Sequence, residues 1–336
     1  MDPLTHLVTG ALVAQSLAPE EHRWLTSLVA AGAAVVPDLD FLARKAPARL
    51  LFLRLHRGLT HSLLALQVIG ACAAGTAHLL FGLPFWPTFG ACALAALTHA
   101  ILDAVMHSTG LQLLWPWSRR LTLPLLIGLN PLTSSARCAE RSLNVCLRCT
   151  MHSAVLSPLV LLLWAGLIIS LPLSSWRLVS QLTLAAAMGY LLLAGLLRLR
   201  ARALLAAQLG GGRVVGIYPA GFSPSRWLGL VAEPDGEHAL LAVDALRVKI
   251  SPHARFAPPE QGAKVELTRR TPTVAEFLNN AIAPHVSLHA NVVVWRDLAY
   301  AFSPSVSLFA VRVELEGQQI RAEEFRERWD HPPERP

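Results

Sequence analysis

Four long stretches of the chain are apolar and carry no formal charge. They cover residues 61–82, 84–102, 149–176 and 178–197, and none of them contains Asp, Glu, Lys or Arg. A helix needs about 20 apolar residues to cross a bilayer, whereas apolar runs of about 10 to 14 residues are typical of buried helices in soluble domains. The pattern therefore predicts four membrane-spanning helices.

Two shorter apolar stretches stand near the N-terminus, at residues 4–17 and 25–37. Each is too short to cross a bilayer alone. We therefore expect a hairpin of short helices lying partly in the membrane, or else one irregular span. A secretory signal peptide is not expected, because Asp2 stands where such a segment carries basic residues and no small-residue cleavage site follows.

The C-terminal third of the chain has a different pattern. Charged residues become common after Gly210–Gly212, which we interpret as a linker. Alternating apolar positions and β-branched residues predict strands over 213–218, 227–233, 239–250, 264–269, 291–295 and 308–315. The segment Thr273–Glu276 fits a capping box that opens a helix toward Ala281.

These patterns together predict a mainly α polytopic membrane domain followed by an α+β soluble domain. The membrane domain, made of the short-helix hairpin and four spans, is expected at residues 1–205. The soluble domain is expected at residues 213–325, and a tail at 326–336.

The composition agrees with a membrane protein and excludes two other classes. Of the 336 residues, 53% are hydrophobic and 15% are charged, whereas about 25% of the residues in an ordinary soluble domain are charged. The apolar content excludes a disordered chain. The presence of only five cysteines in so long a chain excludes a disulfide scaffold.

The distribution of positive charge predicts the orientation in the membrane. The net charge is +7, and basic residues gather at 44–57, 119–148 and 198–202. The connections at 83–84 and 172–177 hold a single Arg between them. By the positive-inside rule, the basic loops and the C-terminal domain are expected in the cytoplasm. Nucleic-acid binding is not expected, because the basic residues are spread among loops rather than along one element.

Histidine and aspartate residues gather in the first third of the chain, at the ends of the apolar stretches. Because the second predicted span returns to the side from which the first begins, three separate segments bring these side chains to one membrane face. His99 and Asp103, four residues apart, share one face of a helix. The residues concerned are His6, Asp38, Asp40, His56, His61, His99 and Asp103.

This set of side chains predicts a divalent metal site. Ionisable groups at a membrane edge are costly unless they are paired, liganded or functional. Imidazole and carboxylate suit Zn, Mn or Fe, which can activate water for hydrolysis. Each motif also has a simpler interpretation, since Asp38 and Asp40 can cap a turn and His99 can hydrogen-bond Asp103 within a helix. Their convergence on one face favours the metal.

The order and spacing of these motifs resemble the YdjM/YbcI family of membrane-bound metal-dependent hydrolases. The likeness covers about residues 1–200 and rests on His6, Pro37–Asp40, His56–Ser62 and His99–Asp103. Residues 114–118 also resemble the short aromatic-Pro-Ser segment that follows in that family. Residues 218–227 are similar to the start of the soluble extension that many members carry.

The resemblance implies an inner-membrane protein distantly related to zinc-dependent phospholipase C and P1-type nucleases, which cleave phosphoesters with a cluster of metal ions. It carries the seven His and Asp residues over as metal ligands, with zinc preferred and manganese or iron as alternatives. One of Asp38, Asp40 or Asp103 would instead orient water as a general base. Arg57 would neutralise a substrate phosphate, although it fits a positive-inside loop charge equally well.

The expected function is therefore a metal-dependent hydrolase that cleaves a phosphoester, either a lipid headgroup or a soluble one, at the cytoplasmic membrane face. A metal-ion or proton transporter could use the same side chains, but transporter sites lie near the bilayer midplane. A non-catalytic assembly protein acting through its soluble domain is a third alternative. Cys146, Cys149 and His152 have zinc-finger-like spacing, for which reduced free thiols are the simpler interpretation.

Overall fold

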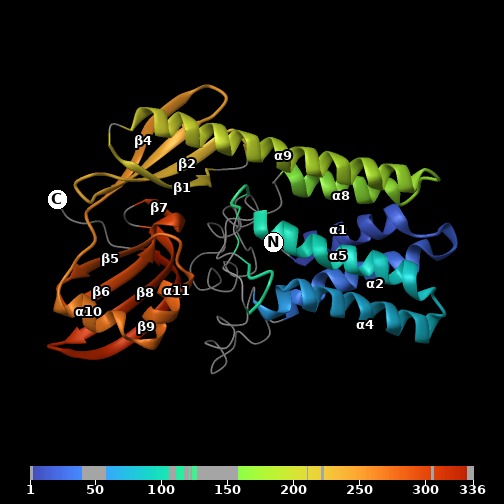
Figure 1. The fold of residues 1–336 in the computed structure, drawn as a ribbon, viewed down its shortest axis with the longest axis horizontal. Helices are drawn as coiled ribbons and strands as arrows, with labels where there is room; N and C mark the ends of the chain where they lie inside the picture. The colour runs from blue at the N-terminus through green and yellow to red at the C-terminus, as the bar shows by residue number, and fades with distance from the viewer. Residues whose placement is uncertain are drawn as a thin grey trace, which may run out of the picture. The chain divides into compact units, whose positions relative to one another are not determined.

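The computed structural model describes residues 3–39, 58–105, 111–116, 121, 123–126, 158–209, 211–220, 223–303 and 306–330. The chain divides into two compact units, Met1–Gly195 and Leu196–Pro336. The first unit is helical, and the second consists mainly of β-strands (Figure 1). The division falls within a single long helix, α9, which begins in the first unit and ends in the second.

The described part of the helical unit begins with two short helices. The hairpin expected at the N-terminus is present as two helices joined by a 3-10 turn at Glu20–His22. The helices are α1 (Pro3–Leu17), α2 (Arg23–Val35), α4 (Leu63–Phe81), α5 (Phe85–Val105), α8 (Pro158–Ser170) and α9 (Trp176–Gln208). Ser62 caps α4 by accepting a hydrogen bond from the backbone N–H of Ala65, and Gly82 ends that helix with a φ of 70°.

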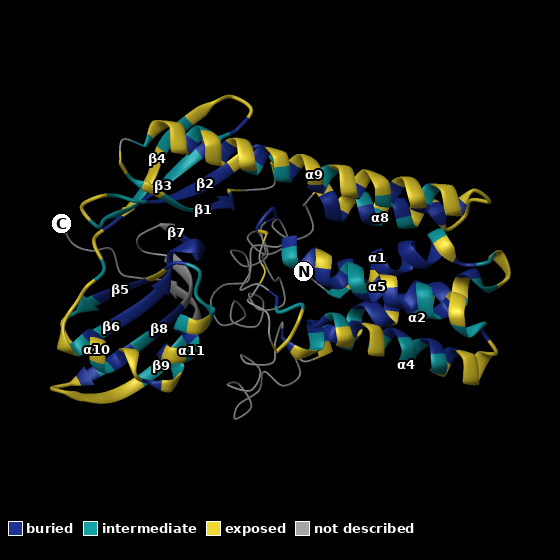
Figure 2. Ribbon diagram, in the orientation of Figure 1, coloured by how far each residue is buried: buried dark blue, intermediate teal, exposed yellow. Residues whose placement is uncertain are grey.

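Three of these helices, α4, α5 and α9, are long and apolar enough to cross a membrane. In their most apolar stretches, 22% of residues are buried in α4 and 28% in α9, against 61% in α5. Figure 2 shows the exposed residues along α4 and α9. Many of these exposed side chains are large and apolar, which is typical of a lipid-facing surface and not of a water-exposed one.

The predicted span at 149–176 is described only in part. Its described helix, α8, has 13 residues and is about 20 Å long, shorter than the hydrocarbon core of about 30 Å. The residues before Pro158 lie outside the described part of the chain.

Small residues allow the helices of the first unit to approach closely. A Cβ atom placed on Gly70 of α4 would lie 2.9 Å from the backbone of Ala93 in α5, and one on Gly10 of α1 would lie 2.8 Å from Cβ of Ala34 in α2. The hydrophobic effect does not drive helices together in lipid, because lipid tails are as apolar as the helices. Close van der Waals contact is therefore a main source of helix association.

A buried polar network joins α1 and α2 to α8 and α9. The side-chain oxygen of Gln15 accepts hydrogen bonds from the hydroxyls of Ser170, at 2.7 Å, and Ser180, at 2.9 Å. The Arg23 guanidinium donates to the carbonyl of Leu171 at 2.9 Å, and Arg177 donates to the carbonyl of Ala18 at 2.7 Å. The α8–α9 turn therefore lies against the α1–α2 turn.

The second unit contains two antiparallel sheets. The first has the order β1–β2–β3–β4, and the second has the order β5–β6–β8–β7 with β9 paired to β8. The strands are β1 (Arg213–Pro219), β2 (Arg226–Ala232), β3 (His238–Asp244), β4 (Lys249–Phe256), β5 (Pro284–His289), β6 (Val292–Asp297), β7 (Ala301–Ser303), β8 (Val306–Glu316) and β9 (Gln319–Asp330). Two short helices, α10 (Ala263–Arg269) and α11 (Pro272–Asn280), precede the second sheet.

The apolar core of this unit has two main parts. One combines side chains of the first sheet, such as Tyr218 and Leu240, with those of the 3-10 turn Leu298–Tyr300 that follows β6. The other packs α10 and α11 against the second sheet around Val274 and Trp295. The alternation of apolar positions along the strands thus supplies one buried face to each part of the core.

Several predictions for the second unit were wrong in detail. Residues 264–269, predicted as a strand, form helix α10, in which Val265 and Thr268 are buried at helical spacing. The strand predicted over 239–250 is two strands, because a turn at Ala245–Val248 interrupts it.

The helix expected near Thr273 is present, but its cap is a different residue. Thr271 caps it by accepting a hydrogen bond from the N–H of Val274, and a proline follows at the first helical position. Strand β9 runs to Asp330, so the segment expected to form a tail from residue 326 begins within a strand.

Candidate metal centre

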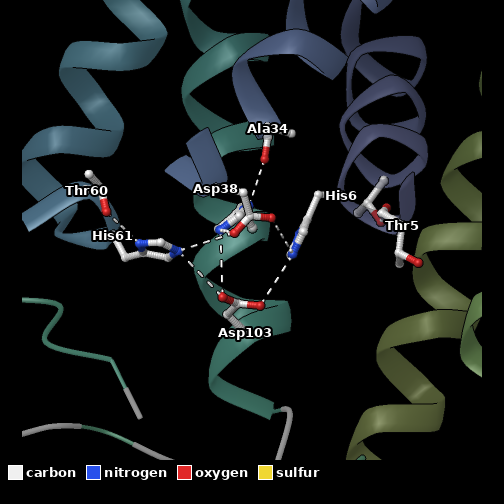
Figure 3. Close-up of polar contacts among 9 residues, drawn as sticks. Thr5, His6, Ala34, Asp38, Thr60, His61 and Asp103 are labelled. Carbon is white, nitrogen blue, oxygen red and sulfur yellow. Dashed lines mark hydrogen bonds and ion pairs between the residues drawn. The ribbon is translucent and has the colours of Figure 1, made fainter. Parts of the chain in front are cut away.

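Five of the predicted ligands meet at one end of the helical unit (Figure 3). His6 lies near the start of α1, and Asp38 follows directly after α2. His61 ends a 3-10 turn, Leu59–His61, that leads into α4. His99 and Asp103 lie in the last turns of α5. Because α1 and α4 begin at this end while α2 and α5 finish there, residues far apart in the sequence converge.

The nitrogen and oxygen atoms of these side chains surround a common point. Asp38, His61, His99 and Asp103 each offer one ligand atom, and these atoms all lie within 4.8 Å of one another. Nε2 of His61 is 3.8 Å from Oδ1 of Asp38 and 3.6 Å from Oδ2 of Asp103. Nε2 of His99 is 3.7 Å from Oδ1 of Asp38 and 3.8 Å from Oδ2 of Asp103.

These separations fit a shared ion better than direct hydrogen bonds. A hydrogen bond between nitrogen and oxygen is about 2.7 to 3.2 Å long. Two ligands of a tetrahedral ion, each about 2.1 Å from it, lie about 3.4 Å apart. The observed distances of 3.6 to 3.8 Å are close to the second value. The four side chains could therefore hold a metal ion.

Neighbouring groups orient two of the imidazoles. Nδ1 of His99 lies 2.8 Å from the carbonyl oxygen of Ala34, so it carries the proton and donates it. Nδ1 of His61 lies 2.9 Å from the hydroxyl of Thr60. The Ala34 contact leaves the Nε2 lone pair of His99 facing the other ligands, and the Thr60 contact gives the same arrangement for His61 when the hydroxyl accepts from Nδ1–H. A hydrogen bond of this kind on the remote nitrogen is typical of metal-binding histidines.

His6 lies beside the four-residue set. Its Nε2 atom is 3.4 Å from Oδ1 of Asp103 and 3.9 Å from Oδ2 of Asp38. Its ring is fully buried and stacks on the ring of His99, with centroids 3.8 Å apart. Among the described residues, neither ring nitrogen of His6 has a partner in hydrogen-bond geometry. A buried imidazole in this state is costly, which supports a ligand in contact with it.

The charge state of Asp38 also fits a metal ligand. His6, His61 and His99 are fully buried, whereas the side chain of Asp38 remains 16% exposed. Burial by itself raises the pKa of the Asp38 carboxyl, but the hydrogen bond with His61 and the charge that His99 and His6 carry when protonated outweigh it and lower the pKa to about 2. Asp38 is therefore ionised at neutral pH, as a metal ligand must be.

Three other predicted site residues, Asp40, His56 and Arg57, lie outside the described residues, as do Cys146, Cys149 and His152. The orienting contacts from Ala34 and Thr60 were missed in the sequence. Thr60 is adjacent to His61 in the sequence, and this adjacency is a weak indication of their contact. The Ala34 contact is made by a backbone carbonyl, which any residue provides, so no sequence signal marks it.

These features define a membrane protein whose helical region encloses a buried His/Asp cluster able to hold a metal ion. Residues 1–173 match the family model described as YdjM inner membrane protein. The chain belongs to this family, as the resemblance of its motifs predicted. Neither the curated proteins nor the solved structures gave a match to the chain.

Proposed function

We propose that the protein is a membrane-bound metal-dependent hydrolase that cleaves a phosphoester at the cytoplasmic face of the inner membrane. The observation that carries this proposal is the convergence of Asp38, His61, His99 and Asp103 from three separate segments, with ligand atoms within 4.8 Å of one another. Both imidazole and carboxylate ligands are present, a donor set that suits zinc, with manganese or iron as alternatives.

Some of these side chains would bind the metal ion, and others would act on water or on the substrate. His61, His99 and Asp103 are buried and would hold the ion, with His6 as a further ligand. Asp38 is the most exposed of the five, so it can bind the ion and orient a water molecule toward substrate. A divalent ion held there would supply a Lewis acid that polarises a phosphoryl oxygen and lowers the pKa of water. Asp40 keeps its proposed role as a metal ligand or an alternative general base, and Arg57 keeps its proposed role as a phosphate-binding residue.

The depth of the cluster favours hydrolysis over transport. Asp103 is two residues from the end of α5, and His61 is two residues before the start of α4. Transporter sites instead lie near the bilayer midplane, at broken helices. A site at helix ends is accessible to a lipid headgroup or to a soluble phosphoester without passage across the membrane.

The proposed topology has four spans after the N-terminal hairpin. The α8–α9 turn lies against the α1–α2 turn through Arg23 and Arg177, which is the end of α1 and α2 away from His6 and Asp38. Helix α9 therefore runs from that end toward the end that carries the cluster. With the third span predicted from the sequence over 149–176, the chain returns to the side of the basic loops, so the proposal places the C-terminal domain in the cytoplasm by the positive-inside rule.

The test is hydrolysis by the full chain purified in detergent. The metal-loaded protein is assayed with bis(p-nitrophenyl) phosphate as a soluble phosphodiester and with phospholipid vesicles as lipid substrate. We expect hydrolysis of at least one substrate, loss of activity after EDTA, and recovery on adding Zn²⁺, Mn²⁺ or Fe²⁺.

The matched variants for this assay are His99→Ala, which removes a ligand, and His22→Ala, which alters a partly exposed histidine at the other end of α1 and α2. Only His99→Ala should lose activity. Equal rates for the metal-loaded wild type and His99→Ala on both substrates would contradict the hydrolase.

A further inference from the structure

Helix α9 is longer than a bilayer requires. It has 33 residues and is about 50 Å long, against about 30 Å for the hydrocarbon core. Arg198 is the first charged residue after the uncharged stretch at 178–197, so the hydrocarbon boundary falls near it. The remainder of α9, up to Gln208, therefore extends into the aqueous phase.

The first sheet folds back along this extension toward the membrane. Nε of Arg198 donates a hydrogen bond to the carbonyl of Ile217 in β1, at 3.3 Å. Arg198 stands ten residues before the end of α9, and Ile217 stands four residues after the start of β1. This contact forms only if β1 runs back alongside α9 in the opposite direction, as Figure 1 shows. The end of β1 therefore points toward the bilayer.

The strand register identifies what else lies at that end. Ile217 pairs with Gly229 in β2, and Gly229 pairs with Leu241 in β3. Strand β3 continues three residues farther, to Asp244, which adds about 10 Å in the direction of the membrane. The turn between β3 and β4 therefore lies at the end of the sheet that is directed toward the bilayer surface.

This turn presents apolar side chains to its surroundings. Leu246 is 60% exposed and Val248 is 54% exposed. Val248 has a φ of 53°, a conformation that is strained for a β-branched residue and that Gly or Asn would adopt at lower cost. The Asp244 carboxylate fixes the turn by accepting hydrogen bonds from the N–H groups of Leu246 and Arg247. The two apolar side chains are thus held outward on a well-defined turn.

The charges of the sheet differ between its two ends. Exposed Arg226, Arg247 and Lys249 surround the apolar pair. The turn at the opposite end, between β2 and β3, carries the acidic residues Glu233, Asp235 and Glu237. A basic, apolar-tipped turn directed toward the bilayer and an acidic turn directed away complement a membrane that contains anionic lipids.

We propose that the β3–β4 turn is a membrane-contact element. Leu246 and Val248 enter the boundary between headgroups and acyl chains of the bilayer that α9 spans, while Arg247 and Lys249 bind anionic headgroups. The contact fixes the orientation of the C-terminal domain at the membrane surface. It is independent of the metal centre and of hydrolysis.

The test measures the depth of the turn in the full chain reconstituted into nanodiscs. In a chain whose five cysteines are replaced by alanine, Leu246→Cys or Val248→Cys carries a bimane fluorophore, and Asp235→Cys is the control at the opposite turn. The discs contain phosphatidylcholine with or without phosphatidylglycerol, plus a spin-labelled lipid as quencher. We expect quenching at 246 and 248 to exceed that at 235 by at least about twofold and to be stronger with the anionic lipid.

Two further measurements make the result decisive. The double substitution Arg247→Glu and Lys249→Glu should remove the difference between anionic and neutral discs. A photo-crosslinking amino acid at position 246 of the cysteine-containing chain should give lipid adducts. Equal quenching at 246 and 235, or adducts to a second copy of the chain instead of lipid, would overturn the proposal.

Discussion

The rings of His6 and His99 stack with their centroids 3.8 Å apart and their planes inclined by 27°, although they lie on different helices. Two protonated imidazoles in this position would repel each other in a buried site. Neutral rings that direct lone pairs at a cation avoid this repulsion. The stacking of α1 on α5 through these residues therefore supports a metal site rather than a set of simple ion pairs.

Asp103 is predicted to be the most sensitive ligand, because its carboxylate faces His6, His61 and His99 at 3.4 to 3.8 Å. In Asp103→Asn the anionic charge is lost, and metal content measured by plasma mass spectrometry should fall by at least about tenfold. Asp235→Asn, in an exposed turn of the other unit, should retain it. The ligand assignment fails if wild-type protein purified without chelator and offered Zn²⁺, Mn²⁺ or Fe²⁺ holds no metal above background.

Close packing of α4 on α5 is predicted to depend on Gly70. A Cβ at this position would lie 2.9 Å from the backbone of Ala93, so Gly70→Val must separate the helices and should destabilise the protein by about 1 to 3 kcal/mol. Gly75→Val is the control on the same helix, since a Cβ there meets no atom of the described residues within 4 Å. Thermal unfolding in detergent should show a lower midpoint for Gly70→Val only, and equal midpoints would refute close packing.

The residue that caps α11 is Thr271 in the structure, whereas the sequence predicted a capping box that begins at Thr273. Thr271 accepts a hydrogen bond from the N–H of Val274 and donates one to Glu323 on β9. Thr271→Ala should therefore lower the free energy of unfolding of the C-terminal unit by about 1 kcal/mol, the usual effect of losing a cap. Thr273→Ala should have little effect. Hydrogen exchange of the α11 amides measures the difference, and greater sensitivity at Thr273 would restore the capping box predicted from the sequence.

His285 is predicted to make the C-terminal unit less stable in acid. Burial, together with the charges of Arg296 and His238, outweighs a hydrogen bond to the Ala257 carbonyl and lowers its pKa from 6.5 to about 4. Between these values the unfolded state binds more protons. The contribution of His285 is thus fully present above about pH 6.5 and is lost as the pH falls toward 4, by about 3 kcal/mol.

The measurement is hydrogen exchange of β5 and β6 at pH 7 and pH 4.5, corrected for intrinsic rates. His285→Gln should reduce the acid-induced loss of protection. His253→Gln, which alters an exposed histidine on β4, should leave it unchanged. An identical pH dependence in wild type and His285→Gln would show that another group is responsible.

Local patterns in the sequence placed the clustered His and Asp residues at helix ends more accurately than they placed the strands. His99 and Asp103 are four residues apart on one helix, and His61 stands next to an apolar run, so local patterns were enough to place them at helix ends. Residues 264–269 were mistaken for a strand because Val265 and Leu267 alternate, while the buried pair is Val265 and Thr268. Short segments fit both periods, and only packing distinguishes them.

The sequence by itself determined the apolar helices and the residue types available for metal binding. A bilayer selects long uncharged runs, and this requirement acts on each segment separately. Only the tertiary structure decided that His6 stacks on His99, that Ala34 orients His99, and that the β3–β4 turn lies at the end of its sheet toward which β1 returns. These relationships depend on how the elements pack, fold back and pair in register, and no local pattern along the chain encodes the distances between elements.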